Sequence, residues 1–265
     1  MTENLQSGYD ALEWIGELYD AVPAYNARSD IAFYVDEARS AAGEILEIGC
    51  GTGRVLLPTA QAGLRITGVD ESPRMLERCR LSLEQQPESV RSCVTLLQAD
   101  MRTLNLGKNF ALATIPFRPF QHLVTVEDQI RALRSIHRHL DPGGRLVFDV
   151  FNPDIRLLAK DRVTESEDTS ETALPDGGSF RRTSRVVAVN PTEQISNVEL
   201  TYYVTAVDGE TRRLVHAFSM RWYWRYEVEH LLARCGFGLV AVYGNFDRSS
   251  LGERSPEMIF VAERN

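Results

Sequence analysis

The order of apolar segments between residues 44 and 151 limits the fold of this chain more than any other feature. Short apolar runs of strand length alternate with longer segments in which apolar residues recur at helical spacing. The expected strands are residues 44–49, 64–70, 93–100, 110–117 and 145–151, and the expected helices are 54–63, 72–83 and 127–140. Such alternation is typical of βαβ crossovers, in which helices cover both faces of a parallel sheet. The sequence therefore predicts an α/β fold.

The alternation stops after residue 153. Residues 161–178 are polar and rich in Glu, Asp, Ser and Thr, which predicts a flexible connection or lid. Three strand candidates follow at 179–190, 195–210 and 212–224, and a helix at 226–237 with strands at 238–246 and 256–264 closes the chain. We expect one domain over residues 1–265, with an antiparallel β insertion at 155–225 that acts as a lid or as a dimerisation element.

Composition excludes several classes of partner. The formal net charge of -8 argues against binding to a phosphate backbone, so no nucleic acid partner is expected. The four cysteines form no CxxC pair, the first residues lack the basic and apolar segments of a secretory leader, and no apolar stretch approaches 18 residues. We therefore expect a reduced cytoplasmic protein that does not associate with a membrane.

Three glycines follow the first expected strand and open a helix. Gly49, Gly51 and Gly53 allow a tight turn and a close approach of backbone to a ligand, as in nucleotide-like cofactor sites. The dinucleotide fingerprint would place a glycine at position 54, where this chain has Arg54. Asp70 ends the second strand, where a carboxylate can accept hydrogen bonds from both hydroxyls of a ribose. Both NAD-type and adenosine sites use this arrangement, so it does not separate them.

Several motifs together resemble the class I methyltransferases that use S-adenosylmethionine. They are Glu-Ile-Gly-Cys-Gly-Thr-Gly at 47–53, Gly-Val-Asp-Glu-Ser-Pro-Arg-Met-Leu at 68–76, Gln-Ala-Asp-Met at 98–101 and Leu-Asp-Pro-Gly-Gly at 140–144. The resemblance covers roughly residues 20–151 and the C-terminal helix and hairpin. It implies a Rossmann-like seven-stranded sheet flanked by helices, with S-adenosylmethionine as the cofactor.

The resemblance also implies a role for each motif residue. Glu47 would steady the amino end of the methionine moiety, Asp70 would hold the ribose, and Asp100 with the Met101 amide would recognise adenine. The full set of expected cofactor-binding residues is Tyr19, Glu47, Gly49, Gly51, Gly53, Asp70, Glu71, Asp100, Met101 and Ile115. Structural alternatives are that Glu47 only orders the loop, that Asp70 caps the next helix, and that Asp100 is a solvated strand end.

The acceptor is expected at the carboxyl ends of the fourth and fifth strands. Nucleic-acid amine methyltransferases carry a D/N-P-P-aromatic motif after the fourth strand, whereas this chain has Ile-Pro-Phe at 115–117. The metal-dependent catechol type needs an acidic ligand there, and residues 114–118 offer none, so we expect no metal. Three features resemble a small-molecule branch of this family, which includes amino-sugar N,N-dimethyltransferases and glycine N-methyltransferase-like enzymes. These features are the segment Glu17 to Asp20, the segment 110–123 and the insertion.

By matching residues to that branch, the resemblance implies two catalytic residues, Tyr19 as a lid over the cofactor and His122 as a base or substrate anchor. Arg118 and Gln121 join His122 as expected substrate-binding residues. Structural alternatives are that His122 donates to a loop carbonyl, that Tyr19 is an ordinary aromatic on a helix face, and that Arg118 pairs with a nearby carboxylate.

The predicted function is S-adenosylmethionine-dependent methyl transfer to a small molecule, with an amine favoured over a hydroxyl. In-line displacement requires mainly that an uncharged lone pair is held close to the methyl group and that water is excluded. Three alternatives stay open. They are a nucleotide-dependent oxidoreductase, a noncatalytic S-adenosylmethionine-binding protein and a protein methyltransferase whose partner docks on the insertion.

Overall fold

The computed structural model describes residues 14–158 and 163–265, which form two compact units. The α/β unit contains residues 29–153 and 222–265, and the β unit contains the described parts of residues 1–28 and 154–221. The expectation that residues 1–265 act as a single domain stays a prediction. No helix among the described residues is long and apolar enough to cross a bilayer.

The α/β unit is built on a seven-stranded sheet with the order β10-β11-β5-β4-β1-β2-β3. Its strands are β1 (Ile45–Ile48), β2 (Ile66–Asp70), β3 (Val94–Gln98), β4 (Phe110–Ile115), β5 (Leu140–Phe151), β10 (Phe237–Tyr243) and β11 (Glu257–Arg264). β1 to β5 are parallel, whereas β11 runs antiparallel to both β5 and β10. The predicted α/β fold is confirmed.

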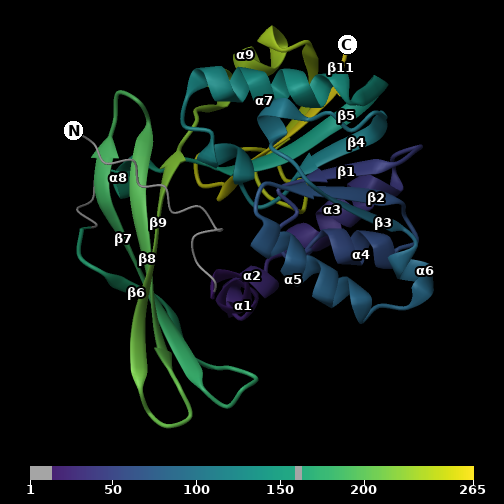
Figure 1. Ribbon diagram of the computed structural model, residues 1–265. Helices are drawn as coiled ribbons and strands as arrows, with labels where there is room; N and C mark the ends of the chain where they lie inside the picture. The colour runs from purple at the N-terminus through teal and green to yellow at the C-terminus, as the bar shows by residue number, and fades with distance from the viewer. Residues whose placement is uncertain (1–13, 159–162) are drawn as a thin grey trace. The chain divides into compact units, whose positions relative to one another are not determined.

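Helices cover both faces of this sheet (Figure 1). They are α3 (Asp30–Arg39), α4 (Leu56–Gln61), α5 (Pro73–Glu84), α6 (Glu88–Arg91), α7 (Val126–Arg138) and α9 (Arg225–Arg234), with 3-10 turns η2 (Met101–Thr103) and η3 (Pro119–His122). α7 and α9 pack on one face, where Leu133 and Leu232 are buried with Phe148. α3, α4 and α5 pack on the other face with Val147. Because β5 is covered on both faces, its apolar residues run without polar interruption from 146 to 148.

The β unit contains an antiparallel sheet with the order β6-β7-β8-β9. Its elements are β6 (Ser166–Ala173), β7 (Ser179–Asn190), β8 (Ile195–Thr205), β9 (Thr211–Arg221), α1 (Ile15–Asp20), α2 (Pro23–Asn26) and α8 (Ile155–Leu158). Ile15, Leu18 and Val22 pack with Phe180 and Tyr202 of the sheet in one buried cluster. The N-terminal helices therefore belong to the same unit as the insertion.

Two expectations about the insertion are wrong. The polar segment expected as a flexible connection contains strand β6, because an edge strand needs only backbone pairing, here with β7, and one buried side chain, Thr169. The last insertion strand ends at Arg221 rather than continuing to residue 224 through the aromatic residues. Tyr223 is instead buried in the α/β unit, where its hydroxyl lies within hydrogen-bonding distance of the carbonyls of Phe120 and Leu123.

Candidate functional site

The glycine turn between β1 and α4 has the backbone conformation that the sequence predicts. Gly49, Gly51 and Gly53 have φ angles of 67°, 55° and 93°, all in the left-handed region. A Cβ atom at Gly49 would lie 2.7 Å from Cγ of Pro119, whereas at Gly51 it would meet only Cε of Met75, at 3.8 Å. Gly49 is therefore required for close packing, whereas the space beside the Cα of Gly51 is open.

Asp70 links this turn to the start of α5. Its Oδ2 accepts a hydrogen bond from the Gly51 amide at 2.8 Å, and its Oδ1 accepts one from the Ser72 amide at 2.9 Å. The cap of α5 is Ser72 itself, whose Oγ accepts from the Met75 amide at 3.2 Å. Each carboxylate oxygen can accept more than one hydrogen bond, so these contacts leave Asp70 able to receive ribose hydroxyls.

Glu47 is a buried acid near the end of β1. Burial raises its pKa from 4.5 to about 8, against the opposing effects of the Arg54 charge and a hydrogen bond from the Leu56 amide. Its Oε2 has no hydrogen-bond partner among the described residues. Arg54 is itself held in a fork by Asp30, at 2.8 and 2.6 Å. A buried carboxylate oxygen without a partner fits a ligand that brings its own positive charge.

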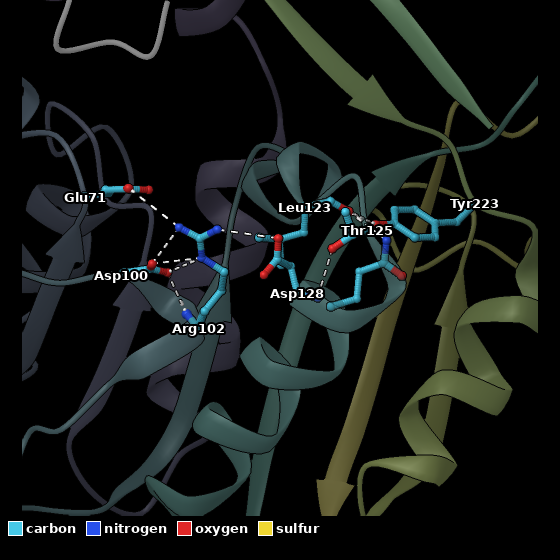
Figure 2. A network of polar contacts seen from close by, with 8 residues as sticks. Glu71, Asp100, Arg102, Leu123, Thr125, Asp128 and Tyr223 are labelled. Carbon is cyan, nitrogen blue, oxygen red and sulfur yellow. Dashed lines mark hydrogen bonds and ion pairs between the residues drawn. The ribbon is translucent and has the colours of Figure 1, made fainter. Parts of the chain in front are cut away.

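Asp100 lies at the end of β3, in the turn that leads into η2. The Arg102 amide donates to its Oδ1 at 2.8 Å, Nε of Arg102 lies 2.8–2.9 Å from both carboxylate oxygens, and Nη2 lies 2.7 Å from Oδ2 (Figure 2). Burial opposes ionisation of Asp100, but these hydrogen bonds and the Arg102 charge outweigh it and lower the pKa of the carboxyl. Asp100 is therefore an ionised hydrogen-bond acceptor.

The other expected cofactor residues of the α/β unit lie along the same edge of the sheet. Glu71 follows Asp70 directly and approaches Arg102, with Oε1 3.8 Å from Nη2. Met101 begins η2 and packs against the core, and Ile115 is the buried last residue of β4. Their contacts with the cofactor stay predictions.

The chain after β4 is strained. Phe117 and Arg118 have φ angles of 66° and 72°, which non-glycine residues adopt only when the surroundings compensate. Oδ1 of the buried Asp149 supplies part of that compensation by accepting from the Phe117 amide at 2.8 Å, and it also accepts from the Tyr34 hydroxyl at 2.7 Å. These two partners of Asp149 could not be predicted from spacing, because they lie 32 and 115 positions away.

The three expected substrate residues lie in or beside η3. Arg118 pairs with Glu257, with Nη2 2.5 Å from Oε1. Gln121 is buried, and its Oε1 accepts from the Phe151 amide at 3.0 Å. His122 is exposed at the end of η3. Arg118 and Gln121 thus make contacts within the chain, and the acceptor roles of all three residues stay predictions.

Tyr19, the expected lid, lies on α1 of the β unit. Its ring centroid is 4.9 Å from that of Tyr25, whose hydroxyl accepts from Nη1 of Arg182 at 2.7 Å. Arg182 is buried and also pairs with Asp168 at 2.8 Å. This cluster was missed, since no spacing rule connects Tyr25 with a residue 157 positions later. The role of Tyr19 toward the cofactor stays a prediction.

Comparisons with known proteins agree with this geometry. Residues 45–144 match a family described as a methyltransferase domain. The chain is 27% identical over 253 residues to the cypemycin N-terminal methyltransferase of a Streptomyces species, covering 94% of this chain and 95% of that protein. It is 33% identical over 121 residues to the dTDP-3-amino-3,4,6-trideoxy-alpha-D-glucopyranose N,N-dimethyltransferase of Streptomyces venezuelae, covering 46% of this chain and 48% of that protein.

A solved structure gives the same assignment. The fold is similar to that of S-adenosylmethionine-bound CalS10, an amino pentose methyltransferase from Micromonospora echinaspora, with a TM-score of 0.69, 25% identity and coverage of 94% of this chain and 97% of that one. Oε2 of Glu47, which has no hydrogen-bond partner among the described residues, and the open space beside Gly51 fit S-adenosylmethionine as the cofactor. Residues 45–144 thus match a methyltransferase domain, and the chain as a whole is similar to S-adenosylmethionine-dependent methyltransferases.

Proposed function

We propose that this methyltransferase transfers a methyl group to an amine nitrogen of a small molecule by in-line displacement. The observation that carries the methyl-transfer part is the buried Glu47 carboxylate, whose Oε2 has no partner among the described residues and which lies beside a left-handed glycine turn. The amine part is supported by the names of the three similar proteins, which refer to the N-terminus of cypemycin, an amino-substituted glucopyranose and an amino pentose.

Each end of the cofactor has a proposed partner in the α/β unit. S-adenosylmethionine, when bound, supplies a methyl group on a sulfonium, which is already a strong methyl donor. Glu47 would receive the ammonium of the methionine moiety, Asp70 the ribose hydroxyls, and Asp100 with the Met101 amide the adenine. These groups lie near the carboxyl ends of β1, β2 and β3, where open α/β sheets bind their ligands.

The acceptor must be presented as a neutral amine, because an ammonium has no lone pair for the attack. His122 is the proposed acceptor of the ammonium proton, directly or through water, since an imidazole exchanges protons near neutral pH. Arg118 and Gln121 are proposed to position the acceptor, and Tyr19 to cover the cofactor. In-line displacement also requires that water is excluded from the reacting groups.

Matched acceptor pairs test the amine assignment. We would incubate the protein with methyl-labelled S-adenosylmethionine and pairs of small molecules that differ only by an amino or a hydroxyl group, including nucleotide-linked sugars, and identify products by mass spectrometry. The proposal expects label only in the amine member, slower transfer by His122→Ala, and normal transfer by His230→Ala, which removes an exposed histidine on α9. Label only in the hydroxyl member would show O-methylation instead.

A homodimer through the insertion is a further part of the proposal. β6 and β9 are the edge strands of the four-stranded sheet, and exposed edges invite pairing with a second copy. Light scattering across a range of protein concentrations measures the mass directly. A monomer mass at every concentration would contradict a dimer.

A further inference from the structure

Arg102 connects three acidic residues at the edge of the sheet. Its guanidinium contacts Asp100 after β3, approaches Glu71 after β2 at 3.8 Å, and lies 3.5 Å from Oδ2 of Asp128 in the first turn of α7 (Figure 2). Asp128 is held in turn by Thr125, whose Oγ1 accepts from the Asp128 amide at 3.1 Å. One arginine side chain thus links the ends of two strands with the start of a helix.

We propose that Arg102 is a positioning residue that makes the cofactor site selective for adenine over bases lacking the exocyclic amine. This inference rests on the proposed contact between Asp100 and the base. Arg102 acts through Asp100, by fixing the orientation of its carboxylate and by keeping it ionised. The nucleobase itself would contact Asp100.

The geometry leaves Asp100 little freedom. Nε of Arg102 donates to both carboxylate oxygens, and the Arg102 backbone amide donates to Oδ1. The Asp100 carboxylate is thus held by the Arg102 guanidinium and by the Arg102 backbone amide, and it can rotate only by breaking charge-assisted hydrogen bonds. Its remaining acceptor capacity therefore has a fixed direction.

The ionised state determines which base is accepted. A carboxylate has no proton and can only accept hydrogen bonds, so it suits the exocyclic amine of adenine. Hypoxanthine presents a carbonyl oxygen at the same position, and two acceptors facing each other lose the hydrogen bond and repel. A lost hydrogen bond to a charged group corresponds to a preference of roughly 10- to 100-fold.

Removing Arg102 should weaken this selectivity. The positive charges that lower the pKa of Asp100 are those of Arg102 and Arg131, whereas Glu71 and Asp128 contact the Arg102 guanidinium. Without Arg102, the partly buried Asp100 carboxyl loses its hydrogen bonds from that side chain and most of the nearby positive charge, so its pKa rises and its orientation is no longer fixed. A carboxyl that is protonated part of the time can donate to a carbonyl oxygen, which favours hypoxanthine at acidic pH.

The main test compares two product analogues by calorimetry. S-adenosylhomocysteine and S-inosylhomocysteine, which carries hypoxanthine, would be titrated into the wild type, Arg102→Met, Arg102→Lys and Asp100→Asn. We expect the wild type to prefer the adenine ligand by roughly 10- to 100-fold and Arg102→Met to reduce this ratio to below about 5-fold. Arg102→Lys keeps the charge but loses the fork, so an intermediate ratio is expected. Asp100→Asn presents an amide that donates as well as accepts, and the ratio should approach one.

A matched control separates positioning from general stabilisation. Arg80→Met removes an arginine of α5 that pairs with Glu77 at 3.3 Å, and the ratio should stay at the wild-type value. An Arg102→Met variant that loses affinity for both ligands by the same factor would overturn the inference. If the wild type binds S-adenosylhomocysteine and Asp100→Asn keeps the wild-type ratio, the base contact is assigned to the wrong residue. Failure of the wild type to bind S-adenosylhomocysteine would refute the proposed function itself.

Discussion

Replacing Glu47 with glutamine should stabilise the cofactor-free protein at neutral pH while weakening its affinity for the cofactor. Glu47 is fully enclosed by protein, and burial raises its pKa from 4.5 to about 8. Glutamine has nearly the same shape and can keep the hydrogen bond from the Leu56 amide. It cannot ionise in the unfolded or the folded chain, so folding no longer requires the uptake of a proton, and it cannot neutralise a ligand ammonium.

The size of the effect follows from the two pKa values. Between pH 4.5 and about 8 the carboxyl of the unfolded chain is ionised while that of the folded chain stays protonated, so the folded state loses stability as the pH rises. The loss is about 1.4 kcal/mol per pH unit, which amounts to roughly 3 kcal/mol at pH 7 and less than about 1 kcal/mol at pH 5. For a chain of this length that difference corresponds to a rise in Tm of roughly 5–10 °C at pH 7 for Glu47→Gln.

Thermal denaturation followed by circular dichroism from about pH 5 to pH 8 measures this directly. The matched control is Glu44→Gln, which removes a carboxylate just before β1 that pairs with Lys108 at the surface, 2.6 Å away. That exposed pair should contribute less than about 1 kcal/mol. S-adenosylhomocysteine should raise the Tm of the wild type more than that of Glu47→Gln, because a ligand stabilises the folded state according to its affinity. A Tm difference between Glu47→Gln and wild type that is the same at every pH would refute the reasoning.

Two further substitutions test how the strained turns are held. Gly49→Ala places a Cβ 2.7 Å from Cγ of Pro119 at a φ of 67°, so denaturant unfolding should show a loss of about 1–3 kcal/mol in the free energy of unfolding. Calorimetry should show at least a roughly tenfold loss of affinity for S-adenosylhomocysteine. A variant with wild-type affinity would contradict a close approach of the ligand to this turn. Asp149→Asn replaces the buried carboxyl that accepts from the Phe117 amide with a side-chain amide, and denaturant unfolding should show a loss of about 1–3 kcal/mol. An unchanged free energy of unfolding would show that the strained backbone after β4 does not depend on Asp149.

The sheet and the position of the cofactor edge could be predicted because they depend on local patterns. Gly49, Asp70 and Asp100 each follow or end an apolar run, and parallel strands bring their carboxyl ends to one edge of a sheet. The strand register shows that β2 and β3 end side by side, because Asp70 pairs with Gln98, two positions before Asp100. The strand pattern and the spacing of these residues were therefore enough to predict that Gly49, Asp70 and Asp100 lie at one edge of the sheet.

The parts that were missed depend on contacts between distant residues or on backbone pairing. Arg182 donates a hydrogen bond to Tyr25, 157 positions earlier in the chain, and Asp149 accepts one from the Phe117 amide, 32 positions earlier. Strand β6 has almost no apolar pattern, because backbone pairing with β7 defines it. The end of β9 was misplaced since the aromatic residues that follow it suit a strand as well as a buried turn, and only the contacts of Tyr223 decide between them.

The two carboxylates at opposite ends of the proposed cofactor differ in protonation, and the difference follows from where each obtains its positive charge. Asp100 has Arg102 within 2.7–2.9 Å, so the protein supplies the charge and the acid stays ionised with or without a ligand. Glu47 has an oxygen without a hydrogen-bond partner among the described residues, and the nearby Arg54 is held by Asp30, so its positive charge must come from the ligand. A neutral base amine needs only an acceptor, whereas an ammonium supplies the positive charge that a buried acid needs in order to ionise. The arrangement therefore matches a ligand that is neutral at its base and cationic at its amino acid end, as S-adenosylmethionine is.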